Sequence, residues 1–196
     1  MPAFPILGKT ITFVPVILGN LIDCGRARLY IAAMPHKYLL KEFEELARSA
    51  ADPDTMMQRV SQRVHLHIPR YNWVGFYLVD KEDASVLLLG PHTGSFTPKA
   101  KISWTEGLCG SAAATRRVIV ADNVAEDPRY IQASDLVKSQ ISVPILAGNK
   151  IAAIFNVESY FMSAFKPAQE REFVEACAKI VSRCFARTAA TVLVHA

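Results

Sequence analysis

Cys109 is the side chain of this 196-residue protein that is best placed for chemistry. It lies in the run Gly107-Leu108-Cys109-Gly110, which is typical of a glycine turn that opens a helix of small residues. The helix dipole lowers the pKa of a thiol at such a start and favours the thiolate. One interpretation is a redox-sensing or ligand-attaching thiol. The other is a small side chain packed under a tight turn, because free cysteines are commonly buried.

A second group of polar residues recurs at alternate positions of two predicted neighbouring strands: Gln140, Ser142, Asn156 and Glu158. Alternate residues of a strand share one face. These side chains would therefore offer one acid and several neutral hydrogen-bonding groups to a small polar ligand. The alternative is a solvated sheet face, which is disfavoured if residues 122–138 cover it.

Aromatic residues are the third set of candidates. Trp73 and Tyr77 share a strand face with Gly75 between them, which would leave room for a ligand between two rings. Trp104 is a further candidate for lining the same pocket. The alternative is that these rings simply fill the core.

The remaining cysteines and histidines indicate no metal site. Cys24, Cys177 and Cys184 form no Cys-x-x-Cys pair, and His65 and His67 are more typical of solvated or capping residues than of ligands. The chain also has no glycine-rich phosphate loop and no Ser-His-Asp set. We therefore expect neither a metal nor a cofactor.

Composition limits the class of protein. Hydrophobic residues make up 51% of the chain, which allows a sizeable core and excludes global disorder. The net charge of +4 comes from scattered basic residues, which argues against a nucleic-acid surface. Four sparse cysteines exclude a disulfide-stapled mini-protein, and together with the lack of a membrane span they predict a cytoplasmic location.

The first 33 residues differ from the rest. Their apolar run, residues 10–22, is too short for a membrane span and is interrupted by Pro15, Gly19 and Asn20. A secretory signal also fits poorly, because no basic segment precedes the run. We interpret 1–33 as an atypical extension that arises from a misassigned start, with Met34 as the natural start. A poorly packed arm and a weak membrane anchor are the alternatives.

From residue 37 the apolar periodicity predicts a complete set of helices and strands. Helices are expected over 37–47, 53–68 and 167–190, with Met56, Met57, Val60 and Val64 on the buried face of the second. Strands are expected at 71–79, 86–89, 100–103, 118–120, 141–146 and 151–157. Residues 107–114 predict a short helix, and 122–138 a polar loop with one helical turn.

These elements predict an α+β domain over residues 34–190, with a tail at 191–196. Its sheet would have about six mostly antiparallel strands. The N-terminal and C-terminal helices would cover one face. The helix and loop of residues 104–138 would cover the other and enclose a pocket.

Several motifs, in this order, resemble a known family. They are residues 71–77 (Tyr-Asn-Trp-Val-Gly-Phe-Tyr), 107–110 (Gly-Leu-Cys-Gly), 139–145 (Ser-Gln-Ile-Ser-Val-Pro-Ile) and 155–159 (Phe-Asn-Val-Glu-Ser). Together they resemble a GAF domain, and within that superfamily they are most similar to the free methionine-(R)-sulfoxide reductases. The resemblance covers residues 36–187.

The thiols of the family are only partly present. These reductases need a nucleophilic cysteine and a partner thiol that resolves the sulfenic intermediate. Cys109 matches the family cysteine of the glycine turn. Lys99 stands where the family has another cysteine, and Ala133 falls at the position of the attacking cysteine.

The acids of the family are also changed. Gln140 stands in place of an acidic residue before the Val-Pro strand, and the family's Asp-x-Asp appears as Asn156-Val157-Glu158. Gln is a far poorer proton donor than a carboxylic acid of raised pKa. Trp73 and Tyr77, which wall the family's pocket, are retained.

Three hypotheses follow. The first is a stand-alone GAF domain that binds a small polar molecule as a sensory or regulatory module. It would pass its signal to a partner or through a homodimer formed by the N-terminal helices and residues 167–190. The second is a divergent reductase that uses Cys109, with thioredoxin as reductant. The third is a purely structural dimer. No nucleic-acid or membrane partner is expected.

Overall fold

A single antiparallel sheet organises the fold. The computed structural model describes residues 24–49 and 52–194, and within them the side chains of residues 35–49 and 52–188. The sheet has the order β3-β2-β1-β6-β5-β4. Its strands are β1 (Trp73–Val79), β2 (Val86–Gly94), β3 (Lys101–Ser103), β4 (Ile119–Ala121), β5 (Ser139–Ala147) and β6 (Lys150–Ser159). Each neighbouring pair is antiparallel, so the predicted α+β class and sheet are confirmed.

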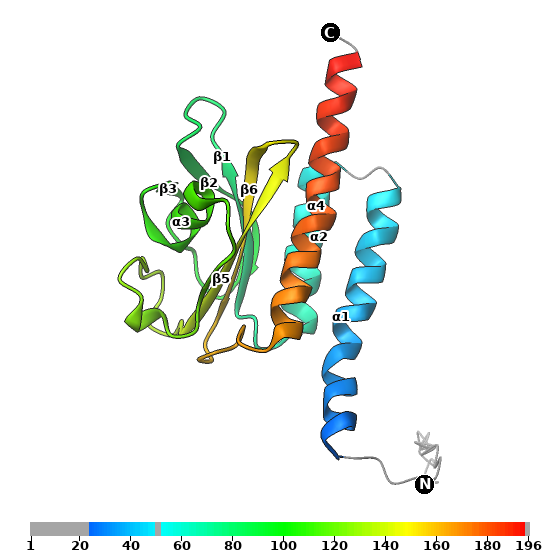
Figure 1. The fold of residues 1–196 in the computed structure, drawn as a ribbon, viewed down its shortest axis with the longest axis vertical. Coiled ribbons are helices and arrows are strands. Elements are labelled where there is room, and N and C mark those ends of the chain that lie inside the picture. Colours follow the sequence, from blue (N-terminus) through cyan, green and yellow to red (C-terminus); the bar gives the residue numbers. More distant parts are fainter. Residues whose placement is uncertain (1–23, 50–51, 195–196) are drawn as a thin grey trace, which may run out of the picture.

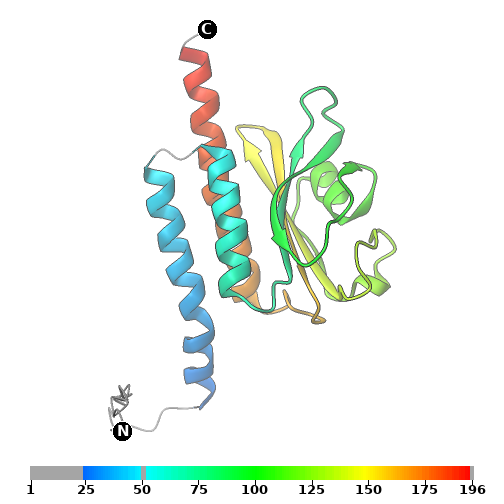
Figure 2. The same cartoon turned by 180° about the vertical axis from the view of Figure 1, so that it is seen from behind.

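The helices divide between the two faces of this sheet. Helices α1 (Cys24–Arg48), α2 (Pro53–His67) and α4 (Ala168–Val194) lie together on one face (Figures 1 and 2). Helix α3 (Gly107–Thr115), the 3-10 turn η1 (Val124–Glu126) and the loop after it lie on the other. The predicted placement of the helices is therefore confirmed.

Helix α2 forms as its sequence predicts. The carboxylate of Asp52 caps it by accepting from the Thr55 backbone N–H at 3.0 Å, and Pro53 occupies its first turn. Its buried face consists of Met56, Met57, Val60, Ser61 and Val64. The methionine stripe is thus core, as expected.

The helix face of the sheet holds the main apolar core. Alternate residues of β5 and β6 supply Ile141, Val143, Phe155 and Val157, all buried. Helix α4 packs Phe173, Cys177, Ile180 and Cys184 against them. The two cysteines are therefore core residues.

The ends of two helices differ from the prediction. Helix α1 begins at Cys24, so the expected domain start at residue 34 falls inside a helix that continues through Pro35. Helix α4 extends to Val194 and includes most of the expected tail. Residues 1–23 lie outside the described part of the chain, and the hypothesis of a misassigned start stays a prediction. None of the helices in the described ranges is long and apolar enough to cross a bilayer.

Strand β2 is longer than expected, and its last residue, Gly94, lies against an aromatic ring of β1. The sequence Gly90-Pro91 is typical of a turn, yet the strand continues to Gly94. A Cβ on Gly94 would lie 2.4 Å from Cδ1 of Trp73 on the neighbouring strand. The missing side chain of Gly94 therefore leaves the space that the indole occupies.

Candidate functional site

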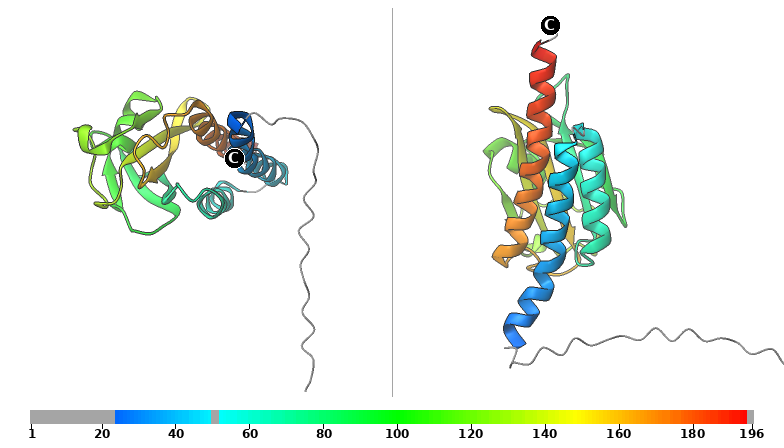
Figure 3. Two further views of the ribbon diagram at one scale, coloured as in Figure 1. Left: turned by 90° about the horizontal axis from the view of Figure 1, so that it is seen from below. Right: turned by 90° about the vertical axis from the view of Figure 1, so that its right-hand side faces the viewer.

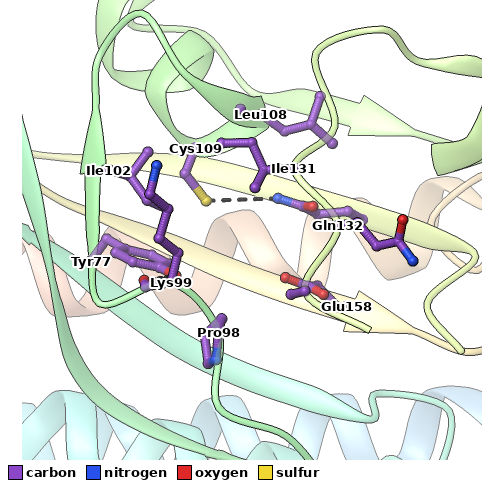
Figure 4. Close-up of a pocket in the computed structure, with 12 residues that line it drawn as sticks. Tyr77, Pro98, Lys99, Ile102, Leu108, Cys109, Ile131, Gln132 and Glu158 are labelled. Atoms are coloured by element: carbon purple, nitrogen blue, oxygen red, sulfur yellow. Dashed lines mark hydrogen bonds between the residues drawn. The ribbon is translucent and has the colours of Figure 1, made fainter. Parts of the chain in front are cut away.

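A small cavity lies on the sheet face opposite the three long helices (Figure 4). Strands β1, β5 and β6, the start of α3, the β2–β3 connection and the loop after η1 all contribute to it. Its lining residues are Tyr77, Pro98, Lys99, Ile102, Gly107, Leu108, Cys109, Ile131, Gln132, Ala133, Gln140 and Glu158. We call it the sheet-face pocket. Its volume is about 40 Å³, which is room for a few water molecules.

A hydrogen-bond network forms the floor of the pocket. Gln140 lies opposite Glu158, and Ser142 opposite Asn156, across the β5–β6 pair. The Gln140 Nε2 and the Ser142 Oγ each donate to Asn156 Oδ1 at 2.8 Å. Asn156 Nδ2 donates in turn to Glu158 Oε1 at 2.9 Å. All four side chains are at least 96% buried, so the alternative of a solvated sheet face is wrong.

Glu158 is the acid of the pocket, and half of its carboxyl group is unpaired. Its Oε1 accepts from Asn156, but its Oε2 is buried without a hydrogen-bond partner among the described residues. Burial raises the pKa of this carboxyl to about 7. Lys99 does not neutralise it, because its Nζ pairs with Glu106 Oε2 at 2.9 Å.

Cys109 lies over this network from the first turn of α3. Its Sγ is 3.5 Å from Ser142 Oγ and 3.7 Å from Gln140 Nε2, the contact drawn in Figure 4. Burial raises the pKa of the thiol to about 12. Removal of the sulfur from water thus opposes the thiolate that the helix dipole would favour, and the burial of Cys109 agrees with the interpretation of a small side chain packed under the turn.

The aromatic candidates separate into one pocket residue and two packing residues. Tyr77 lines the pocket, and its hydroxyl donates to the Lys99 carbonyl oxygen at 2.9 Å. Trp73 instead fills the space beside Gly75, where an added Cβ would lie 2.5 Å from the indole. The indole thus occupies the place beside Gly75 that was expected to admit a ligand. Trp104 packs against the apolar cluster that contains Trp73 and does not line the pocket.

Several lining residues escaped the sequence analysis. Leu108, Ile131 and Gln132 reach the pocket from α3 and from the covering loop. Ile131 lies against the start of α3, where a Cβ added to Gly107 would be 3.1 Å from its Cδ1. Loop residues have no periodicity that would indicate which side chain points inward. The glycine of the turn was the available signal that something packs closely there.

Comparison with known proteins identifies the family. A family profile described as GAF domain matches residues 50–186, which is more than half of the chain. The chain belongs to the GAF domain family. Protein ZMO0507 of Zymomonas mobilis is 33% identical over 144 residues, covering 73% of this chain and 84% of that protein.

Named reductases are among the relatives of this GAF domain. The free methionine-R-sulfoxide reductase of Saccharomyces cerevisiae is 29% identical over 113 residues, covering 57% of this chain and 62% of that protein. A solved structure of the reductase from Neisseria meningitidis in complex with its substrate has a TM-score of 0.72 at 25% identity. That match covers 79% of this chain and 91% of the other. The resemblance seen in the sequence is thus confirmed.

The sheet-face pocket coincides with the positions that the resemblance singles out. Lys99, Cys109, Ala133, Gln140 and Glu158 all line it, and Asn156 supports it from behind. The two other cysteines with described side chains, Cys177 and Cys184, pack into the helix-side core. Cys109 therefore has no second thiol within the described pocket. The described residues also hold no cluster of three or more His, Cys, Asp or Glu side chains that could share a metal ion.

Proposed function

We propose that this GAF domain is a binding module for a small zwitterionic molecule, such as a free amino acid, and does not reduce it. The observation that carries the proposal is the unpaired Oε2 of Glu158 at the wall of the sheet-face pocket. A buried carboxylate oxygen without a donor is costly, and a ligand that donates to it removes that cost. An ammonium group is the donor best suited to this position.

The start of α3 supplies the complementary charge. Its N-cap residue, Glu106, makes no side-chain capping hydrogen bond. The N–H groups of the first helical turn have no partner within the helix and carry the positive end of its dipole. Since Gly107, Leu108 and Cys109 line the pocket, an anionic group of the ligand binds there while its ammonium group binds Glu158.

Ligand entry requires the covering loop to move. The cavity of about 40 Å³ has room for a few water molecules, and we expect its cover to move outward when a larger ligand binds. Ile131, Gln132 and Ala133 form its cover. The loop is tied at its base, where Val124 N–H donates to the Lys138 carbonyl at 2.9 Å. We expect the part of the loop between Val124 and Lys138 to move outward, which would enlarge the pocket without breaking this hydrogen bond or the sheet.

Binding without reduction is the function that the residues favour. Sulfoxide reduction needs a thiolate and a resolving thiol, whereas burial raises the pKa of Cys109 to about 12. Lys99 and Ala133 stand at the other two cysteine positions of the resemblance. A divergent reductase that uses Cys109 is the second candidate. It is supported by the place of Cys109 in the pocket and by the names of the relatives.

Calorimetric titration with free methionine-(R)-sulfoxide tests binding. We expect saturable heat at pH 7, and a loss of affinity of about 10-fold or more in Glu158→Gln, because a hydrogen bond to a charged group contributes about 1.5–3 kcal/mol. Glu175→Gln, on the exposed face of α4, is the matched control and should bind like the wild type. An absence of heat in the folded wild type, or equal affinity in Glu158→Gln, would contradict the proposal.

The role of the domain in the cell is proposed from the same pocket. We infer that the module is sensory or regulatory, because a pocket without a complete catalytic set can still couple occupancy to the movement of its cover. A homodimer through the long helices α1 and α4 and a cytoplasmic location complete the proposal. Sedimentation of the full chain with and without methionine-(R)-sulfoxide checks the dimer.

A further inference from the structure

A second polar cluster lies on the helix side of the sheet, away from the sheet-face pocket. Its centre is Glu170 in the first turn of α4, whose Oε2 accepts from the Tyr71 hydroxyl at 2.6 Å. The same oxygen lies 3.4 Å from His36 Nε2, and the other carboxylate oxygen lies 3.5 Å from Arg70 Nη1. His36 and Glu170 are each only 8% exposed, and Tyr71 is fully buried. The cluster thus joins α1, α4 and the segment before β1.

His36 packs against α4 and directly follows a proline of α1. Its ring stacks on Phe173 of α4 with centroids 4.3 Å apart and an interplanar angle of 12°. It directly follows Pro35, which lies inside the helix. A proline within a helix removes a hydrogen bond to the preceding turn and weakens the helix there. The N-terminal part of α1 extends beyond the rest of the domain (Figures 1 and 3), so His36 fastens the helix next to its weak point.

We propose that His36 and Glu170 form a pH-responsive clamp that fastens the middle of α1 to the first turn of α4 more tightly when the imidazole carries a proton. An imidazolium–carboxylate hydrogen bond is about twice as strong as a neutral one. Imidazoles commonly change charge between pH 5 and 8. The clamp is therefore strong in mildly acidic solution and weaker above neutrality.

Glu170 stays ionised over this range. Burial opposes its ionisation, but the hydrogen bonds from His36 and Tyr71 outweigh burial and hold the pKa of the carboxyl below its usual range. The contribution of Glu170 is thus present above its unfolded pKa and is lost only as the pH falls through its lower folded pKa.

Other titratable groups also face this region. On α2, His65 Nδ1 lies 3.0 Å from the Tyr71 carbonyl oxygen, and His67 stacks on Tyr38 of α1 with ring centroids 6.3 Å apart. On α4, Cys177 lies near Tyr71, and burial raises the pKa of its thiol above the usual range. The proposal assigns the pH response to His36, so variants of His65 and His67 must be compared with variants of His36.

Hydrogen–deuterium exchange of the full chain tests the clamp. Exchange of peptides covering residues 36–43 is measured at pH 5.5 and 7.5 and corrected for intrinsic rates. We expect these amides to be about 3- to 10-fold more protected at pH 5.5, the range given by strengthening one partly buried hydrogen bond. His36→Gln, which keeps an N–H donor, should show equal protection at both pH values. Glu170→Gln, which keeps an acceptor for Tyr71, should likewise lose the difference in protection between pH 5.5 and 7.5.

The controls separate the clamp from general stability. Glu44→Gln removes the exposed pair of Glu44 with Arg183, also between α1 and α4, and should leave the pH difference intact. His65→Gln and His67→Gln should keep it too. Exchange in α4 reports whether each variant is folded. A wild type without the pH difference, or a folded His36→Gln or Glu170→Gln that retains it, would overturn the proposal.

Discussion

The two faces of the β5–β6 pair are built from the same strands and have opposite chemistry. On the helix side, Phe155 and Val157 lie in a continuous apolar core. On the pocket side, their neighbours Asn156 and Glu158 are equally buried but are held by a network of hydrogen bonds. Apolar burial on the first face stabilises the fold. On the second face, burial leaves a carboxylate oxygen without a partner among the described residues, a cost that the proposed ligand would offset.

The largest effect is expected from truncation on the helix side. Phe155 is fully buried and stacks on Phe76 with ring centroids 4.6 Å apart. Phe155→Ala removes this packing and leaves a cavity, so the free energy of unfolding should fall by about 3–5 kcal/mol. Urea unfolding monitored by circular dichroism measures the change. A decrease below about 1 kcal/mol would show that this face is not the main source of stability.

The pH dependence of stability tests the opposite face. The folded pKa of Glu158, about 7, lies above the ordinary value of 4.5. The protonated carboxyl therefore stabilises the folded protein fully below pH 4.5. This stabilisation is lost as the pH rises through 7, so the free energy of unfolding should fall by about 3 kcal/mol.

Glu158→Gln removes this titrating group. In urea unfolding series between pH 4.5 and 8, the free energy of unfolding of this variant should decline much less than that of the wild type, whereas Glu175→Gln should decline like the wild type. Identical pH profiles for wild type and Glu158→Gln would mean that Glu158 is ionised in the folded protein throughout this range.

Removal of the central amide should have an intermediate effect. Asn156→Ala takes an acceptor from Gln140 and Ser142 and a donor from Glu158. Buried polar groups without partners are destabilising, so the free energy of unfolding should fall by about 2 kcal/mol. Affinity for methionine-(R)-sulfoxide should fall as well, because Glu158 loses its orientation. Unchanged affinity in the folded variant would show that the network does not position Glu158.

The smallest effect is expected from Cys109→Ser. Ser142 and Gln140 already lie within hydrogen-bond reach of this position, so a hydroxyl finds partners there. We expect stability to change by less than about 1 kcal/mol and the Kd for methionine-(R)-sulfoxide by less than about 3-fold. A tenfold weaker Kd would assign Cys109 a direct part in binding.

The helices and strands could be predicted from sequence because each depends on local patterns. The alternation through residues 139–159 predicts which side chains share a face, and the Asp52-Pro53 start predicts the cap of α2. Strand β2 could not be delimited, because the need for Gly94 comes from the indole of Trp73, which lies on another strand.

The site could be predicted only in part for a similar reason. The strand positions Tyr77, Gln140 and Glu158 were found from their spacing, and they do meet in one pocket. The environment of Cys109 could not be found, because its pKa depends on how completely the sheet and the covering loop remove it from water. Ile131 was missed because no periodicity orients loop side chains.

The central claim is that the chain keeps the pocket of its reductase relatives without their redox chemistry. The most direct test is NADPH oxidation coupled to thioredoxin, measured on the folded protein with free methionine-(R)-sulfoxide. We predict no turnover above background at concentrations that saturate binding. Turnover that is abolished by Cys109→Ser would contradict the account and would establish Cys109 as the thiol of a divergent reductase.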